Sequence, residues 1–507
     1  MRVLFVTSEA FPLAKSGGLA DVSSALPIAL ARQGVDVRIL MPGYPDALAK
    51  LKNPRVEARF ASLLGIKDAA LVSGQLPDSQ VPVWLVDAPP LFDRGGGLYQ
   101  DEEGRDWADN ALRFGFLAHV AAMIASDFLA QWTPDVVHAN DWHAGLIPLL
   151  LAMRGGASRP ATVLTVHNLA FQGNFPPQAL SVLGIPDHYF HADGIEFYGQ
   201  MSFLKAAIRF SDSVTTVSPS YAREALTPEF GCGMDGILRD RGESFSGILN
   251  GIDTDRWNPA TDPCLAEPYD LGDMSGKSAC KDELLDELDL KVDGDRPLIG
   301  FVSRLAHQKM ADVMLESVPS MVAGGAQFAL LGEGDPTLEA AFRQLGERYA
   351  GSIAIRTNYD ESLAHRLHAG ADILLAPARF EPCGLTQMYA LRYGTLPVVR
   401  KTGGLADTVT DATATSLARR TATGFVFEES TLSALGAAID HALALYQQPT
   451  IWRRLQFQAM SQDFSWNASA AKYIGLYRQM LGLRDPPQPE SLPQWAVEAD
   501  SGRYAAT

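Results

Sequence analysis

Residues 297–309 read PLIGFVSRLAHQK, in which an apolar run leads directly into a loop that carries two cations. A short and continuously apolar run is typical of a strand that is buried on both faces of a parallel sheet. Similar runs follow at residues 327–331, 352–356, 372–376 and 396–399, with helix-like segments between them. This alternation predicts βα units that build a parallel sheet.

The first half of the chain has the same rhythm. Apolar runs lie at residues 3–7, 36–41, 83–86, 135–138, 161–166 and 213–217, and helices are expected at residues 19–33 and 110–131. The chain has 507 residues, of which 47% are apolar. Because a single core stops growing at about 250–300 residues, two domains are expected. The sequence therefore predicts two doubly wound α/β domains with a boundary near residue 247.

The C-terminal part is less regular. Residues 432–446, 451–464 and 468–483 have helical patterns, and a charged helical stretch lies between residues 250 and 296. The segment DPPQPESLPQ at residues 485–494 is rich in proline, so we expect an extended or loosely ordered tail.

Composition excludes several classes of protein. The net charge is −17, which argues against binding to nucleic acid. The four cysteines form no CxxC pair, so neither a zinc ribbon nor a disulfide framework is expected. The N-terminal apolar run is too short for a signal peptide, and no window is apolar enough to span a membrane. We therefore expect a cytoplasmic protein without a membrane partner. No carboxylate cluster indicates a metal site, and none is expected.

One sequence pattern occurs twice. KSGGLADV occupies residues 15–22 and KTGGLADTV occupies residues 401–409, and both place paired glycines where a loop can open into a helix. A helix N-terminus exposes unpaired N–H groups, and glycine allows close approach of a ligand, so such loops suit phosphates. The alternative for each copy is a tight turn.

Charged side chains follow two of the predicted strands of the second half. Arg304 and Lys309 come after the run that ends near residue 303, and Glu381 comes after the run at residues 372–376. Ligands of open α/β sheets bind at the carboxyl ends of the strands, where two cations can hold a diphosphate and a carboxylate can bind sugar hydroxyls. The alternatives are a solvated basic turn for the cations and a helix cap for Glu381.

Two motifs of the first half likewise lie at the carboxyl ends of predicted strands. VHNLAFQG at residues 166–173 places His167 at a strand end, and HANDWHAG at residues 138–145 supplies Asp141, Trp142 and His143. An aromatic ring beside a carboxylate is a common way to hold a sugar. A structural histidine and a core tryptophan are the alternatives.

Five segments together resemble the bacterial glycogen synthases in order and spacing, and the resemblance runs from residue 1 to about residue 483. They are KSGGLADV, VHNLAFQG, SRLAHQK, RFEPCGLTQMYALRYGTLPVV (residues 379–399) and KTGGLADTV. It implies a GT-B fold, with two Rossmann-like domains facing across a deep interdomain cleft that holds the active site. Residues 1–246 would form the N-terminal domain on the acceptor side, and residues 247–465 the C-terminal domain that binds the nucleotide sugar. Residues 466–483 would be a helix that crosses back to the N-terminal domain, and residues 484–507 a loosely ordered tail.

The resemblance also implies roles for single residues. The donor would be contacted by Lys15, Gly17 and Gly18, its diphosphate by Arg304 and Lys309, and the transferred glucose by Glu381. The remaining matched positions would lie beside the sugar and phosphates (Gly384, Leu385, Thr386), stack on adenine (Tyr359), line the glucose site (His167, Asp141, Asn250) or lie elsewhere in the cleft (Tyr99). Catalysis would rest on Glu381, His167, Arg304 and Lys309.

The activity implied is that of a retaining glucosyltransferase. It would move glucose from ADP-glucose to the non-reducing end of an α-1,4-glucan, either glycogen or a maltooligosaccharide, and release ADP without a cofactor or a metal. Related transferases carry a second glutamate eight residues after the first, where this chain has Tyr389, as the glycogen synthases do. Since no partner acid to Glu381 is evident, we expect front-face attack with retention.

Two alternatives stay open. The first is a glucan phosphorylase, with pyridoxal phosphate, or a UDP-sugar transferase of the same fold. The second is a sugar-binding protein without enzymatic activity that closes its two lobes on a ligand.

Overall fold

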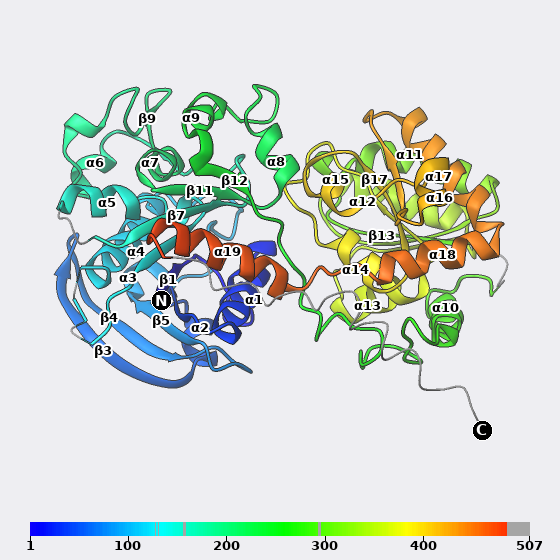
Figure 1. The fold of residues 1–507 in the computed structure, drawn as a ribbon, viewed down its shortest axis with the longest axis horizontal. Coiled ribbons are helices and arrows are strands. Elements are labelled where there is room, and N and C mark those ends of the chain that lie inside the picture. Colours follow the sequence, from blue (N-terminus) through cyan, green and yellow to red (C-terminus); the bar gives the residue numbers. More distant parts are fainter. Residues whose placement is uncertain (127, 130, 156–158, 293–295, 484–507) are drawn as a thin grey trace, which may run out of the picture.

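The structure is a computed structural model of the chain, which describes residues 1–126, 128–129, 131–155, 159–292 and 296–483. Two lobes lie side by side, each around its own sheet (Figure 1). The chain passes from the first lobe to the second and back, and the two crossing segments pair through a bridge between Ile252 and Ser465. The proline-rich segment at residues 485–494 lies outside the described residues.

The first lobe holds a nine-stranded sheet over the described residues, in the order β12-β11-β7-β6-β1-β2-β5-β4-β3. The strands from β12 to β5 are parallel, whereas β4 is antiparallel to both β5 and β3. These strands are β1 (Arg2–Val6), β2 (Asp36–Pro42), β3 (Lys52–Leu63), β4 (Ile66–Gln75), β5 (Pro82–Asp87), β6 (Val136–Asn140), β7 (Ala161–Val166), β11 (Ser213–Thr216) and β12 (Phe245–Gly247). A small sheet adds β8 (Asn174–Phe175), β9 (Glu196–Phe197) and β10 (Gln200–Ser202).

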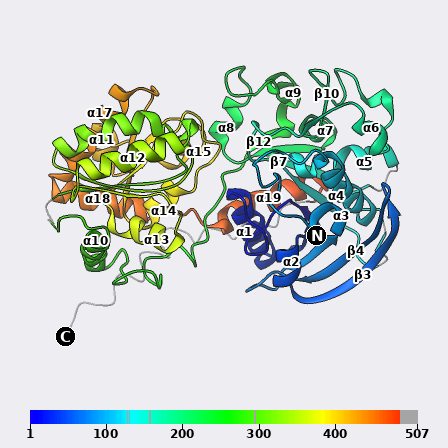
Figure 2. The same ribbon diagram turned by 180° about the vertical axis from the view of Figure 1, so that it is seen from behind.

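Helices pack around the large sheet (Figure 2). They are α1 (Gly18–Arg32), α2 (Pro45–Lys50), α3 (Pro89–Phe92), α4 (Asn110–Ile124), α5 (Ile147–Arg154), α6 (Ala179–Val182), α7 (Phe203–Phe210), α8 (Pro219–Glu224) and α9 (Asp235–Asp240). The helix expected at residues 110–131 therefore ends earlier, at Ile124. The β3–β4 hairpin was not predicted at all.

The second lobe holds a six-stranded sheet in the described part of the chain, in the order β15-β14-β13-β16-β17-β18. Its strands, all parallel, are β13 (Leu298–Val302), β14 (Gln327–Leu331), β15 (Ile353–Arg356), β16 (Ile373–Ala376), β17 (Leu396–Arg400) and β18 (Phe425–Phe427). Counted in chain order this is 3-2-1-4-5-6, the order of a Rossmann sheet. The prediction of two Rossmann-like domains is confirmed.

Both faces of this sheet are covered. Ile299 and Phe301 of β13 belong to one apolar core, whereas Leu298 and Val302 belong to another on the opposite face. The covering helices are α10 (Ser275–Glu287), α11 (Ala311–Ala323), α12 (Pro336–Arg348), α13 (Glu361–Gly370), α14 (Thr386–Arg392), α15 (Gly403–Thr408), α16 (Ala414–Arg419), α17 (Leu432–Tyr446) and α18 (Pro449–Met460). Successive residues of a strand point to opposite faces, which explains the continuous apolar pattern of PLIGFV.

The last helix returns to the first lobe. Helix α19 (Trp466–Met480) lies beside α1, and its Tyr473 and Tyr477 are buried in the core of the first lobe (Figure 1). The Tyr477 hydroxyl lies 2.7 Å from Nδ1 of the buried His138 in β6. A polar bond inside an apolar core is strong because the alternative is an unpaired buried group, so this contact fixes α19 on the sheet.

The lobes also touch through α8 and α15. Glu224 of α8 accepts a hydrogen bond from the N–H of Gly403 at 2.8 Å, and Ser220 donates to Asp407 at 2.7 Å. The Ser218 hydroxyl donates to the carbonyl of Pro382 at 2.7 Å. These polar bonds hold the two strand-end regions against each other.

Candidate active site

Two charged side chains of the second lobe meet where the strand order of its sheet reverses. Lys309 follows β13 and Glu381 follows β16, and these strands are neighbours at the switch point of the sheet. The ammonium of Lys309 forms an ion pair with the carboxylate of Glu381, and both side chains are largely buried, with exposed fractions of 20% and 12%. The crevice at such a switch point is the usual ligand site of an open α/β sheet.

The loops that carry this pair are bonded to each other. The side chain of Gln308 donates to the carbonyl of Phe380 at 3.1 Å, and the N–H of Arg379 donates to the carbonyl of Gln308 at 2.8 Å. Arg304 is exposed, and its Nη2 lies 3.4 Å from the amide oxygen of Gln308. The structure therefore brings Lys309 and Glu381 together and leaves the Arg304 guanidinium open to solvent.

Glu381 does not cap the helix that follows it. Helix α14 begins at Thr386, and its N-cap residue is Leu385, with no side-chain cap. Gly384, just before it, has a φ of +73°, a conformation that favours glycine. The carboxylate of Glu381 bonds to Lys309 instead, so the helix-cap alternative is wrong.

The two glycine pairs open helices, but their surroundings differ. A Cβ on Gly403 would meet the carbonyl oxygen of Glu381, and a Cβ on Gly404 would lie 2.2 Å from the carbonyl oxygen of Cys383. In contrast, a Cβ on Gly17 or Gly18 would have nothing within 4 Å. Gly403 and Gly404 therefore allow two loops to pack closely, whereas Gly17 and Gly18 border open space.

Two carboxylates from neighbouring segments contact the loop at residues 15–18. Lys15 pairs with Asp21 at 2.9 Å, and the N–H groups of Ser16 and Gly17 donate to the carboxylate of Glu9. The Tyr99 hydroxyl also donates to Glu9, at 3.2 Å. Burial raises the pKa of the Glu9 carboxyl, although these hydrogen bonds oppose the shift. The Glu9 carboxylate thus binds the amide groups that would otherwise suit an anionic ligand. Glu9 was not predicted as a site residue.

His167 and Asp141 lie on neighbouring loops of the first lobe. The Asp141 carboxylate accepts the main-chain N–H of His167 at 2.6 Å. Asp141 has a φ of +53°, a strained conformation for a residue other than glycine. Burial raises the pKa of Asp141 to about 7 and lowers that of His167 to about 3. His167 is therefore neutral near pH 7, and Asp141 is more readily protonated than an exposed aspartate, so both side chains suit contact with uncharged sugar hydroxyls.

Trp142 and His143 are mostly packing residues. The Trp142 ring makes an edge contact with Phe114, and the His143 ring stacks on Tyr99 with centroids 4.5 Å apart. Both are buried, so the core alternative holds for Trp142. The Tyr99 hydroxyl is held by Ser8 and Glu9.

Side chains of both lobes approach each other beside the 15–18 loop. Lys15 of the first lobe and Arg256 of the second lie over the same ring, that of Phe11, at 5.5 and 4.6 Å. Tyr359 follows β15 and is 53% exposed; burial of its hydroxyl, together with the charges of Glu361 and Asp21, raises the pKa of that hydroxyl to about 12.

Asn250 lies on the segment that joins the lobes. It is buried, and its Oδ1 has no hydrogen-bond partner among the described residues. Since a buried unpaired carbonyl oxygen is costly, a donor group supplied by a ligand would relieve it.

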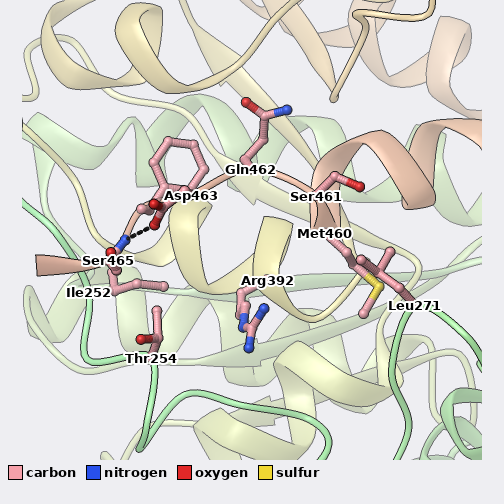
Figure 3. A pocket seen from close by; sticks show the side chains of 10 residues that line it. Ile252, Thr254, Leu271, Arg392, Met460, Ser461, Gln462, Asp463 and Ser465 are labelled. Atoms are coloured by element: carbon pink, nitrogen blue, oxygen red, sulfur yellow. Dashed lines mark hydrogen bonds between the residues drawn. The ribbon is translucent and has the colours of Figure 1, made fainter. Parts of the chain in front are cut away.

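A separate pocket of about 310 Å³ lies at the crossing segments (Figure 3). Arg392, Met460 and Leu271 line it, and the N–H of Ser465 donates to the Asp463 carboxylate at 2.9 Å. None of the predicted site residues lines this pocket. It therefore lies where the chain crosses between the lobes, and not at the strand ends.

Asp262, Cys264 and His365 form a group of potential metal ligands in the described part of the chain. The Asp262 carboxylate is already bonded to Nδ1 of His365 at 2.6 Å, to the Tyr393 hydroxyl at 2.5 Å and to the N–H of Cys264 at 2.9 Å. Both oxygens of the Asp262 carboxylate therefore already accept hydrogen bonds from protein groups. Within the described residues, no helix is both long enough and apolar enough to cross a membrane.

Family models match both lobes. Residues 2–240 match the starch synthase catalytic domain, and residues 286–454 match group 1 glycosyl transferases.

Curated proteins and solved structures match nearly the whole chain. A glycogen synthase of Burkholderia thailandensis is 52% identical, over 95% of this chain and 91% of the relative. A glycogen synthase of Thioalkalivibrio sulfidiphilus is 50% identical, over 95% of this chain and all of the relative. Among solved structures, the catalytic domain of starch synthase IV from Arabidopsis thaliana, bound to ADP and acarbose, superposes with a TM-score of 0.85. It is 32% identical and covers 95% of this chain and 99% of that one.

Proposed function

Because this chain belongs to the glycogen and starch synthase family of glycosyltransferases, we propose that it extends an α-1,4-glucan in the cytoplasm, using ADP-glucose as donor. Glucose would pass to the non-reducing end of glycogen or a maltooligosaccharide with retention of the anomeric configuration, and ADP would leave. The observation that carries this proposal is the Lys309–Glu381 pair at the switch point of the second sheet. The pair would offer a cation to a phosphate and, beside it, a carboxylate to a sugar.

The donor diphosphate is proposed to bind the cations of both lobes. Arg304 and Lys309 would reach it from the second lobe, and Lys15 would reach it from the first. Arg304 is open to solvent, and space borders Gly17 and Gly18, so neither contact requires a rearrangement of the core. Positive charge held at the leaving group lowers the barrier to its departure, and three cations can supply it without a metal or a cofactor.

The glucose is proposed to lie between Glu381 and the paired loops of His167 and Asp141. Its hydroxyls would supply the donor that the buried Oδ1 of Asn250 lacks. Gly384, Leu385 and Thr386 would lie beside the sugar and the phosphates. The exposed ring of Tyr359 would stack on adenine, since stacking requires an accessible aromatic face. Residues 247–465 would thus form the donor domain, and residues 1–246 the acceptor domain.

Retention is proposed to proceed by front-face attack, in which the departing phosphate assists the acceptor hydroxyl. Tyr389, at the position where related transferases carry a second glutamate, stacks on Trp257 with ring centroids 3.8 Å apart. An aromatic ring at this place cannot serve as a second carboxylate for a double displacement.

Release of ADP from ADP-glucose in the presence of glycogen tests the proposal directly. We expect kcat/KM to be higher with ADP-glucose than with UDP-glucose or GDP-glucose, and activity to persist after thorough chelation of metals. An equal or higher value with UDP-glucose would favour the UDP-sugar transferase, and absorbance of pyridoxal phosphate would favour the phosphorylase. Binding without turnover would leave only a sugar-binding protein.

A further inference from the structure

We propose that Asn140 is a positioning residue that holds the imidazole of His167 in the tautomer with the proton on Nε2, which leaves Nδ1 to accept a hydrogen bond from a substrate hydroxyl. Asn140 is the last residue of β6, is fully buried and precedes Asp141. The choice of substrate rests on the proposed function, whereas the tautomer does not.

The orientation of the Asn140 amide follows from its neighbours. One end of the amide faces the main-chain carbonyl of Val6 at 3.1 Å and that of His138 at 3.5 Å. Carbonyl oxygens only accept hydrogen bonds, so the group that faces them is the NH₂ group. The other end, Oδ1, therefore faces Nε2 of His167, at 3.1 Å.

The position of the imidazole proton follows in turn. Oδ1 of an amide has no hydrogen to donate, so the bond to His167 requires a proton on Nε2. Burial lowers the pKa of His167 to about 3, and the ring is therefore neutral near pH 7. A neutral imidazole carries one proton, so Nδ1 has a free lone pair.

The groups around His167 leave this lone pair available. Asp141 is engaged with the main-chain N–H of His167, and the nearby rings of His138 and His143 are themselves held neutral by burial. Within the described residues, Nδ1 of His167 makes no hydrogen bond, and the side chain is only partly buried. A lone pair attracts a hydroxyl that donates and repels a phosphate oxygen. Asn140 thus decides that His167 recognises the sugar and not the diphosphate.

The tautomer can be observed by ¹⁵N NMR of the full chain labelled at histidine, with the His167 signals assigned from a His167→Gln variant. We expect the Nε2–H form in the wild type and in Asn140→Asp, since the carboxylate still accepts from Nε2. Asn140→Leu, which has a similar shape, should lose the preference. His138→Gln lies two residues earlier on the same strand and serves as the control, because it should disturb the strand without changing the tautomer.

Kinetics supply the second measurement. Asn140→Leu should lower kcat/KM for ADP-glucose about 10-fold, as expected for one lost hydrogen bond, and leave ADP affinity unchanged because ADP lacks the glucose. Asn140→Asp should keep more activity and lose it as pH falls, since a carboxylate raises the pKa of His167.

The outcomes separate the two claims. An Nδ1–H tautomer in the wild type, or the same tautomer in Asn140→Leu as in the wild type, would overturn the role of Asn140 whatever the activity. Absence of turnover with the Nε2–H form intact would count against the proposed function alone. If Asn140→Leu does not fold, the tautomer and pH profile of Asn140→Asp still decide the question.

Discussion

The ammonium of Lys309 and the carboxylate of Glu381 form an ion pair between two loops that lie 72 residues apart in the chain. Both loops follow strands at the switch point of the second sheet, and the main chains of Gln308 and Arg379 lock them together. The pair therefore sits on a rigid support. A phosphate and a sugar could bind to it without reorganisation of the loops, which is the condition for electrostatic catalysis.

Lys309→Ala and Lys15→Ala should each lower kcat/KM for ADP-glucose. Loss of a charge-assisted hydrogen bond costs about 1.5–3 kcal/mol, or roughly 10- to 150-fold. Arg343→Ala is the matched control, because Arg343 also pairs with a glutamate, Glu339, but on the exposed surface of α12. Steady-state kinetics with full activity in either lysine variant would refute phosphate contact at that residue.

Tyr359→Ala should weaken binding of ADP, since stacking of a base on an aromatic ring contributes about 1–3 kcal/mol. Tyr359→Phe keeps the ring and should bind ADP as the wild type does. Calorimetric titration with ADP compares the three proteins. Equal affinity in the alanine variant would remove Tyr359 from the adenine site.

The two glycine pairs should respond differently to alanine. In Gly404→Ala the new Cβ meets the main chain of Cys383, so we expect a loss of about 1–3 kcal/mol in the free energy of unfolding. Gly18→Ala has open space and lies in α1, so its stability should be unchanged or higher, while KM for the donor rises. Urea unfolding and kinetics measure both effects. A destabilised Gly18→Ala with a normal KM would contradict this division of roles.

Asp141 should make the stability of the protein fall with rising pH. Its pKa is about 7 in the folded chain and near 3.8 when unfolded, so the folded state binds more protons between these values. Stability from this group is therefore present at low pH and lost by up to about 1.4 kcal/mol per pH unit as pH rises to 7. Asp141→Asn should lack this dependence in urea unfolding between pH 5 and 7.5. Parallel pH profiles for the two proteins would show that the group is not buried as described.

Most of the fold could be predicted because buried parallel strands are short apolar runs, as in PLIGFV. The β3–β4 hairpin could not be predicted in this way. Strand β3 is mostly exposed, so it lacks an apolar pattern, and its turn at Leu64 and Gly65 takes positive φ values of 50° and 79° without an Asn-Gly or Asp-Gly signal.

Residues of the candidate site could be predicted only where a recognisable motif directly follows a predicted strand. Lys309 and Glu381 were predicted in this way. Their contact could not be predicted, because it depends on the order of the strands in the sheet, and only this contact shows that Glu381 is not a helix cap. Glu9 was missed because its bonds to the amides of the 15–18 loop match no motif, and Glu224 was missed because its partner Gly403 is 179 residues away. Asn140 lies within HANDWHAG, but its role depends on the carbonyl of Val6, which is distant in sequence.

The kcat of Glu381→Gln tests the central claim most directly, because this change keeps the shape of the side chain and removes its charge. If Glu381 contacts the glucose as positive charge develops, kcat should fall about 100-fold or more and ADP affinity should stay near that of the wild type. The melting temperature should fall only as far as the weaker bond between glutamine and Lys309 requires. A variant with near-native kcat and a lowered melting temperature would contradict the account, because Glu381 would then serve only to hold Lys309 in the fold.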